Sequence, residues 1–124
     1  MRRAVLSSGE TSIALRLRDT PTADALWSRL PIEAAARIWG DEVYFEAGGP
    51  RLAEEPEAKA LMTLGEIAYW PDGDAVALGF GETPISAPGE IRLAAPCNVW
   101  ADAEGDLRLL SAVRPGDRIL LRRA

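Results

Sequence analysis

The residue types that most often carry catalysis are scarce in this sequence. Among its 124 residues there is no histidine, and Cys97 is the single cysteine. Without histidine the chain cannot build a Ser-His-Asp or Cys-His arrangement by itself, and it lacks the commonest metal ligand. A single cysteine also excludes an internal disulfide and a multi-cysteine metal site. We therefore predict no catalytic residue, no metal ligand and no cofactor.

Four remaining motifs do not require a functional explanation. Asp72 and Asp74 flank Gly73, and a second acidic group, Asp102, Glu104 and Asp106, surrounds Gly105. Asp and Gly are common in turns, and a complete calcium loop also needs a distant bidentate Glu, so we interpret both groups as turns. Cys97 lies in an apolar segment, which is typical of a buried, unreactive thiol. The motif GFGETP lacks the spacing, the lysine and the following helix of a phosphate loop.

The segment WPDGDAVALGFGETP, residues 70–84, alternates bulky and small residues. The bulky set is Val76, Leu78 and Phe80, and the small set is Ala75, Ala77, Gly79 and Gly81. Because successive side chains of a strand point to opposite faces, the bulky set is predicted inside a barrel. The small set then forms a strip on the outside, where another group can approach the backbone closely.

Two interpretations of this small-residue strip remain open. A loop of the same chain, such as residues 48–60, packs on it, or the strip is the floor of a ligand-binding groove. In the second case Tyr44 and Trp70 are candidate walls, because aromatic side chains with a few polar groups are typical of small-molecule sites. The full set of candidate ligand-binding residues is Tyr44, Arg51, Trp70, Gly79, Gly81, Thr83 and Asn98, with Arg51 as an anchor for an anion.

The elements that would position these residues are mostly short strands. Residues 4–17 predict a hairpin, and Thr20 with Pro21 predicts the start of a helix of about ten residues that ends at Pro31. Residues 32–39 fit a helix and a strand equally well, since three alanines favour the helix while the alternation favours the strand. Residues 43–46 have strand composition, and residues 51–65 show little periodicity and fit a loop or a helical turn.

The second half of the chain predicts another hairpin and a closing strand. Pro71 to Asp74 is a strong turn signal between strands at residues 66–70 and 75–80. A short strand follows at residues 95–101, then a helical turn at 107–113 and a last strand near 118–122. The four tryptophans, Trp27, Trp39, Trp70 and Trp100, are expected in the core or at its rim. The prediction is a mainly β domain spanning residues 1–124, a barrel or sandwich with one or two short helices.

Charge and hydropathy exclude some partners. The net charge is −5 and the isoelectric point is near 4.8, which argues against nucleic acid as the main partner. Residues 41–106 carry 14 acidic side chains, whereas arginines gather at both ends of the chain. If the terminal strands pair, a basic region lies on an acidic body. We find no signal peptide and no membrane-spanning segment, and we expect a cytoplasmic protein without a membrane partner.

Several motifs together resemble one protein family. They are LP at residues 30–31, WGDEVYF at 39–45, GEIAYWPDG at 65–73, FGETP at 80–84 and NV at 98–99. With the helix start DTPTADAL and the ending RPGDRILL, they resemble a small prokaryotic family of cyclophilin-like proteins. The resemblance covers most of the chain in the expected order. It implies a closed cyclophilin-like β-barrel, with residues 32–39 as strand, and places the small-residue strip where cyclophilins bind peptide.

The resemblance to cyclophilins also raises the question of prolyl isomerisation. Active cyclophilins use an arginine next to an aromatic-rich strand, followed by a phenylalanine and a glutamine. Here WGDEVYF contains no arginine, the chain has no glutamine, and only Arg37 and Arg51 lie nearby in sequence. We therefore predict non-catalytic binding of a small metabolite or short peptide in a groove on the barrel. The alternatives are a residual peptidyl-prolyl isomerase and an interaction module that forms a homodimer.

Overall fold

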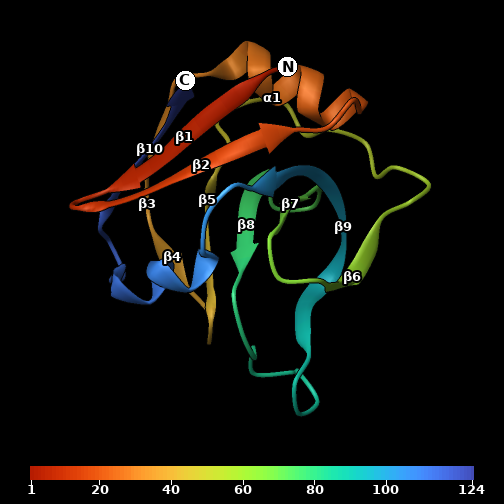
Figure 1. Ribbon diagram of the computed structural model, residues 1–124. Coiled ribbons are helices and arrows are strands. Elements are labelled where there is room, and N and C mark those ends of the chain that lie inside the picture. The colour runs from red at the N-terminus through yellow and green to blue at the C-terminus, as the bar shows by residue number, and fades with distance from the viewer.

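The two ends of the chain lie side by side in one sheet of the computed structural model, which describes residues 1–124 (Figure 1). Strand β1 (Arg3–Ser8) pairs antiparallel with β2 (Thr11–Leu17) on one side and with β10 (Arg118–Arg123) on the other. The predicted N-terminal hairpin and closing strand are both confirmed.

Ten strands form the sheet, and they nearly close it into a barrel. The order is β3-β10-β1-β2-β9-β7-β8-β5-β4, with β6 paired to β9 off this path. The other strands are β3 (Ile32–Ala35), β4 (Arg37–Ile38), β5 (Glu42–Glu46), β6 (Lys59–Met62), β7 (Glu66–Trp70), β8 (Ala75–Gly79) and β9 (Ile91–Ala103). Because β3 and β4 follow each other in the chain but stand at opposite ends of this order, they bring the two edges together.

The resemblance implied strand over residues 32–39, and the structure has strand at residues 32–35 and 37–38. Ala36 joins β3 to β4, and both of its backbone groups are bonded to the turn that leads into the neighbouring strand β10. Its N–H donates to the Asp117 carbonyl at 2.8 Å, and its carbonyl accepts from the Gly116 N–H at 2.8 Å. Pairing with β10 and β5 supplies interstrand hydrogen bonds, whereas an isolated helix of this length is unstable in water. The tertiary contacts therefore override the helix propensity of the alanines.

Two short helices cover the ends of the barrel. Helix α1 (Pro21–Arg29) begins as predicted, with the Thr20 side chain accepting a hydrogen bond from the Ala23 N–H at 3.0 Å and proline in the first turn. It buries Ala23 and Leu26 completely. The 3₁₀ helix η1 (Leu107–Ala112) takes the place of the predicted helical turn and buries Leu107 and Leu110. No helix is long and apolar enough to cross a membrane.

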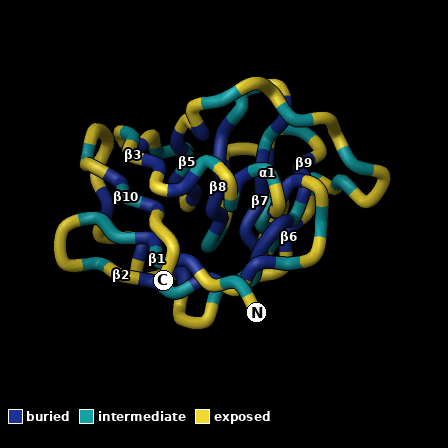
Figure 2. The backbone as a smooth tube through the Cα atoms, turned by 90° about the horizontal axis from the view of Figure 1, so that it is seen from above, coloured by how far each residue is buried: buried dark blue, intermediate teal, exposed yellow.

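The barrel interior contains the main hydrophobic core, seen in Figure 2 as the buried centre of the tube. Val76 and Leu78 are fully buried in it, as their alternation predicted, and Phe80 packs against its edge. Trp100 and Tyr69 are the largest buried side chains. The Trp100 indole N–H donates to the Ala68 carbonyl at 3.1 Å, so this buried polar group is satisfied.

A second, smaller core lies on the outer face of β7 and β8. It consists of Met62, Ala68, Ala77, Leu93 and Cys97. The first half of β9, residues 91–97, runs over this face with β6 beside it, so part of the small-residue strip is covered by the chain itself. A Cβ atom at Gly79 would lie 2.6 Å from Ile91 Cγ2. The covering segment is residues 91–97 rather than residues 48–60.

Two elements differ from the prediction. Strand β6 lies in the segment that was predicted as loop or helical turn, and β9 begins at Ile91, four residues before the predicted strand. The cause is the same for both, because β6 and the first half of β9 pair with each other. Lys59 pairs with Cys97 and Leu61 with Arg92, with an irregularity between them. A bulged register of this kind disrupts the alternation on which strand prediction depends.

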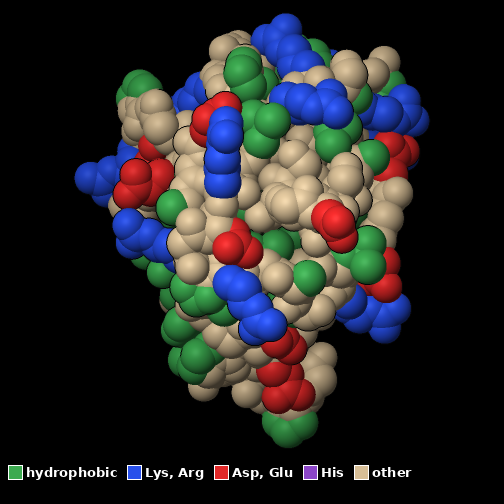
Figure 3. Space-filling model, turned by 90° about the vertical axis from the view of Figure 1, so that its left-hand side faces the viewer, with side chains coloured by type: hydrophobic (Ala, Val, Ile, Leu, Met, Phe, Trp, Pro, Cys, Tyr) green, Lys and Arg blue, Asp and Glu red, His purple; other side chains and the backbone are tan.

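The arginines of the chain ends are interspersed with acidic residues on the surface. β1 and β10 do pair, but four terminal arginines form ion pairs: Arg2 with Asp24, Arg3 with Glu104, Arg18 with Asp102, and Arg118 with Glu33. Figure 3 shows several basic side chains near the top of the view, where the chain ends lie, and basic and acidic side chains interspersed below. Part of the charge of the terminal arginines is therefore balanced by these ion pairs.

Candidate functional site

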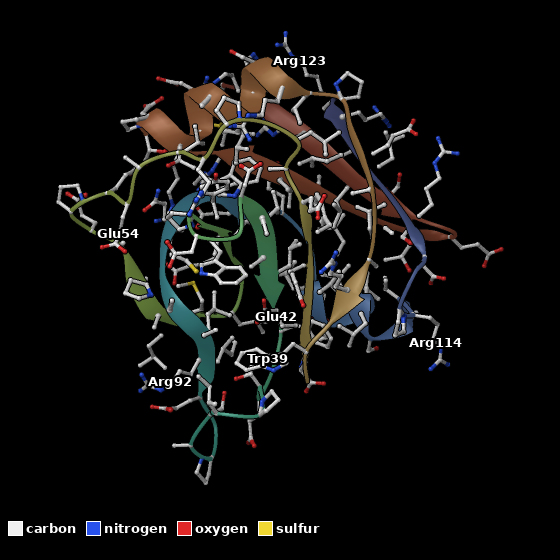
Figure 4. The ribbon with its side chains drawn as sticks, turned by 180° about the vertical axis from the view of Figure 1, so that it is seen from behind. Trp39, Glu42, Glu54, Arg92, Arg114 and Arg123 are labelled. Atoms are coloured by element: carbon white, nitrogen blue, oxygen red, sulfur yellow. The ribbon has the colours of Figure 1, made fainter.

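A small cavity opens on the outer face of the barrel, between β5, β8 and the first half of β9. Its volume is about 210 Å³. Seven of its eight lining residues are hydrophobic: Trp39, Tyr44, Trp70, Ala77, Leu93, Ala94 and Cys97, with Glu42 as the eighth. We call this site the aromatic cavity. Figure 4 shows Trp39 and Glu42 on the side of the barrel where Arg92 marks the start of β9.

Strand alternation places these side chains on one face. In β5, Glu42 and Tyr44 point outward, while Val43 and Phe45 point into the main core. Tyr44 lies opposite Ala77 of β8, and Glu42 lies opposite Gly79. Glu42 and Tyr44 are thus each paired with a small residue of β8. The outer face of β8 is covered by Ile91 at Gly79, whereas at Ala77 it lines the cavity.

Glu42 is the most unusual residue of the cavity. Glu42 is only 6% exposed, and its Oε1 atom is buried without a hydrogen-bond partner. Burial raises the pKa of Glu42 to about 7, because moving a carboxylate out of water disfavours its charged form. Near neutral pH this carboxyl group is therefore divided between its protonated and ionised forms.

Trp70 contributes a second unpartnered polar atom. Its Nε1 is buried and makes no hydrogen bond, in contrast to the indole of Trp100. The backbone fixes the position of this ring, since a Cβ atom on Gly73 would lie 2.4 Å from Cε3 of Trp70. The turn between β7 and β8 thus presses directly against the ring that lines the cavity.

Cys97 lines the cavity from β9 as an unreactive thiol. It is 2% exposed, and Sγ donates to the Ala95 carbonyl at 3.3 Å. Burial, together with the charges of Glu42 and Glu54, raises the pKa of Cys97 to about 12. The thiolate, which is the nucleophilic form, is therefore almost unpopulated at neutral pH, in agreement with the interpretation of Cys97 as an inert thiol.

The structure brings together only two of the seven candidate ligand-binding residues. Tyr44 and Trp70 line the aromatic cavity. Gly79 lies beneath Ile91, and Gly81 lies against the Asp41 carboxylate. Arg51 is exposed, with its guanidinium 3.5 Å from the Asp72 carbonyl.

Thr83 and Asn98 are buried polar residues whose hydrogen bonds stay within the chain. Thr83 Oγ1 donates to the Arg92 carbonyl and so attaches the 80–90 loop to β9. Asn98 Nδ2 donates to Thr22 Oγ1 and to the Ala53 carbonyl, both at 2.9 Å, and Oδ1 accepts from the Glu55 N–H at 2.8 Å. These contacts connect α1 and the 53–55 loop to β9. Because the partners are more than forty residues apart in the chain, no local sequence pattern predicts them.

Trp39 and Glu42 were missed as site residues by sequence reasoning. The available signal was the spacing of Glu42 and Tyr44, two positions apart in a strand and hence on one face. What the spacing did not reveal was that residues 91–97 cover this face and exclude water from the carboxyl group.

The acidic groups interpreted as turns have protein partners. Asp74 accepts hydrogen bonds from the Tyr69 hydroxyl, from Arg29 at 2.9 Å and from the Gly49 N–H at 3.0 Å. These bonds, opposed by burial, lower the pKa of Asp74. Asp102 belongs to β9 rather than to a turn and forms two bonds with Arg18, at 2.7 and 2.8 Å.

A larger, polar cavity of about 460 Å³ lies at the start of α1. Its charged lining residues are Arg18, Asp19, Glu55, Glu57, Lys59 and Glu66. Glu66 binds Lys59 at 2.8 Å and Arg18 at 3.3 Å, so this carboxylate is paired within the chain. The aromatic cavity differs because its carboxyl group has no such partner.

Comparison with known proteins agrees with this architecture. The sequence model of the family described as cyclophilin-like matches residues 2–122. The chain belongs to the cyclophilin-like family. The hypothetical protein AF2241 from Archaeoglobus fulgidus, known from a solution structure, is similar to it with 32% identity and a TM-score of 0.84, over 99% of this chain and 95% of that one. This cyclophilin-like chain matches no curated protein.

The cyclophilin-like fold is also present in a more distant protein. The structure of McbB in complex with tryptophan has a TM-score of 0.69 and 12% identity, over 97% of this chain and 44% of McbB. At this identity the likeness concerns the fold alone. The family and the mainly β barrel are thus confirmed.

Proposed function

We propose that this cyclophilin-like protein binds a small, largely apolar molecule in the aromatic cavity, with one polar group of the ligand meeting Glu42. The observation that carries the proposal is the Glu42 carboxyl group, which is buried in an apolar site and has no partner at Oε1. A buried polar group without a partner costs about 1–3 kcal/mol, and more when it is charged. A ligand that pairs with Glu42 offsets this cost.

The size and lining of the cavity support a small ligand. Ordinary drug-sized sites measure about 300–1,000 Å³ and combine apolar walls with a few polar groups. The aromatic cavity has this composition in about 210 Å³. It accommodates a single ring or a short branched chain, or one side chain of a peptide.

Binding without chemistry is the form of the proposal that the residues favour. Cys97 lines the cavity, and its pKa of about 12 keeps it in the thiol form. Neither Arg37 nor Arg51 lines the site. Arg37 is exposed and pairs with Glu46 at 3.5 Å.

A thermal-shift screen tests the proposal, using small metabolites and proline-containing peptides. A ligand at about 100 times its Kd stabilises the folded state by about 2.7 kcal/mol, a shift of several degrees. Ala94 is exposed where it lines the cavity, so Ala94→Leu fills the site without disturbing the core. The matched control is Ala112→Leu, at an exposed position of η1.

The proposal predicts a shift that Ala94→Leu abolishes and Ala112→Leu preserves. A shift that persists in Ala94→Leu would place the ligand elsewhere on the barrel. The absence of any shift across the panel at millimolar concentration would count against a binding function.

A further inference from the structure

The chemistry of the aromatic cavity points beyond binding to the class of ligand. Resting on the proposed function, we infer that the ligand is a small organic ammonium ion, held by the Glu42 carboxylate and by the rings of Trp39, Tyr44 and Trp70. The observation behind this inference is that three aromatic side chains and one carboxyl group line the same cavity.

The first argument is the aromatic lining. The face of an aromatic ring carries partial negative charge and attracts a cation within about 6 Å of its centre, most strongly when water is excluded. Trp39 and Tyr44 come from β5 and the turn before it, Trp70 comes from the end of β7, and all three meet at one cavity. This protein already uses the same interaction on its surface, where the Arg123 guanidinium lies 4.4 Å from the centre of the Trp27 ring.

The second argument is charge balance around Glu42. The other titratable groups of the lining are Tyr44 on the same strand and Cys97 on β9, and neither supplies a positive charge. On the neighbouring segments, Asp41 lies against Gly81 and Arg92 is bound by Glu90 through two hydrogen bonds. Glu54 adds further negative charge near Cys97.

Ionised Glu42 therefore needs its counter-charge from the ligand. In a site of low polarity, an ion pair with hydrogen bonds stabilises both charges far better than either is stabilised alone. An ammonium N–H that donates to Oε1 would satisfy the atom that the protein leaves without a partner.

The third argument is size. The cavity of about 210 Å³ equals the share of roughly seven water molecules in the liquid. This space suits an amine with one ring or a few methyl groups, whereas a folded peptide segment exceeds it. Benzylamine is a suitable probe, and benzyl alcohol is its neutral counterpart of nearly the same shape.

The inference predicts a pH dependence of a defined sign. The ammonium ion binds the ionised carboxylate, and Glu42 in the empty cavity has a pKa of about 7. Between pH 6 and pH 8 the affinity for benzylamine should rise about tenfold, because the fraction of ionised Glu42 rises by that factor. A neutral ligand that accepts a hydrogen bond from protonated Glu42 would show the opposite trend.

The experiment compares the affinities of benzylamine and benzyl alcohol for the full chain by titration calorimetry or tryptophan fluorescence at several pH values. The variant Glu42→Gln keeps the size of the side chain and removes its charge. The matched control is Glu46→Gln on the same strand, where the side chain is 73% exposed. Trp39→Leu serves as a second variant, at the half-buried rim where folding is least affected.

The inference requires that benzylamine binds at least tenfold more tightly than benzyl alcohol at pH 8. Glu42→Gln should remove this preference and the pH dependence, while Glu46→Gln should keep both. Trp39→Leu should lower the affinity for benzylamine at least about twofold and should lower the affinity for benzyl alcohol less. Binding of benzyl alcohol that equals or exceeds that of benzylamine, and weakens as pH rises, would overturn the ammonium assignment but leave small-molecule binding intact.

Failure of the underlying function has a different signature. If neither compound binds, and Ala94→Leu leaves every shift in the wider screen unchanged, then both the ammonium assignment and the cavity as a binding site are refuted.

Discussion

The carboxyl group of Glu42 and the thiol of Cys97 line one cavity from two strands, and the charge of the first raises the pKa of the second. β5 and β9 are not neighbours in the sheet, so this relationship exists because residues 91–97 cross the outer face of β8. Because of this contact, the reactivity of Cys97 depends on the burial and the charge of the cavity.

The reactivity of Cys97 should be very low in the native protein. Raising the pKa from 9.0 to about 12 lowers the thiolate fraction about a thousandfold near pH 8, and burial slows the reaction further. Reaction with a chromogenic disulfide reagent should therefore be at least about a thousand times slower in native than in denaturant-unfolded protein. Similar rates in the two states would show that the cavity opens readily and would contradict the burial described here.

Ionisation of Glu42 should destabilise the folded protein as pH rises. The folded protein has a Glu42 pKa of about 7 against the ordinary 4.5, so between these values the folded state retains a proton that the unfolded state releases. The contribution is absent below about pH 4.5 and complete above about pH 7, where it reaches about 3 kcal/mol.

The measurement for Glu42 is the difference in unfolding free energy between wild type and Glu42→Gln at several pH values. The variant should gain relative stability from pH 4.5 to pH 7, because it has no group to ionise. Asp74 and Asp102 contribute with the opposite sign in both proteins, so the difference removes their effect. Glu46→Gln should follow the wild-type curve, and a Glu42→Gln curve parallel to wild type would refute the assignment.

Gly73 should control the position of the Trp70 ring. An added Cβ atom would lie 2.4 Å from Cε3 and 2.5 Å from Cζ3 of the indole, closer than real contacts allow, so Gly73→Ala forces the ring to move. We expect a changed tryptophan emission spectrum and at least a severalfold loss of affinity for any ligand of the aromatic cavity, with the barrel still folded.

The matched control for Gly73 is Gly105→Ala. At Gly105 the nearest atom to an added Cβ is Ile13 Cγ2 at 3.8 Å, an ordinary contact. This variant should keep the wild-type emission spectrum and affinity. If Gly73→Ala also keeps both, the ring position does not depend on the turn, and Trp70 is not held as we describe.

Local patterns in the sequence determined a large part of the architecture. The alternation of Val76 and Leu78 determined which face of β8 is inside, and Thr20 with Pro21 determined the start of α1. Turn residues located both hairpins. Each of these signals depends on side chains within a few residues of one another, and neighbouring residues decide them physically through backbone preference and strand pleat.

The tertiary structure decided the rest. Residues 32–38 became strand because β10 and β5 supplied hydrogen bonds, and β6 formed because β9 offered it an edge. The aromatic cavity depends most on such contacts. Glu42 is buried, and its pKa is raised, because residues 91–97 cover the outer face of the barrel beside it. Burial raises its pKa, and burial is a property of partners about fifty residues away in the chain rather than of the residues beside it.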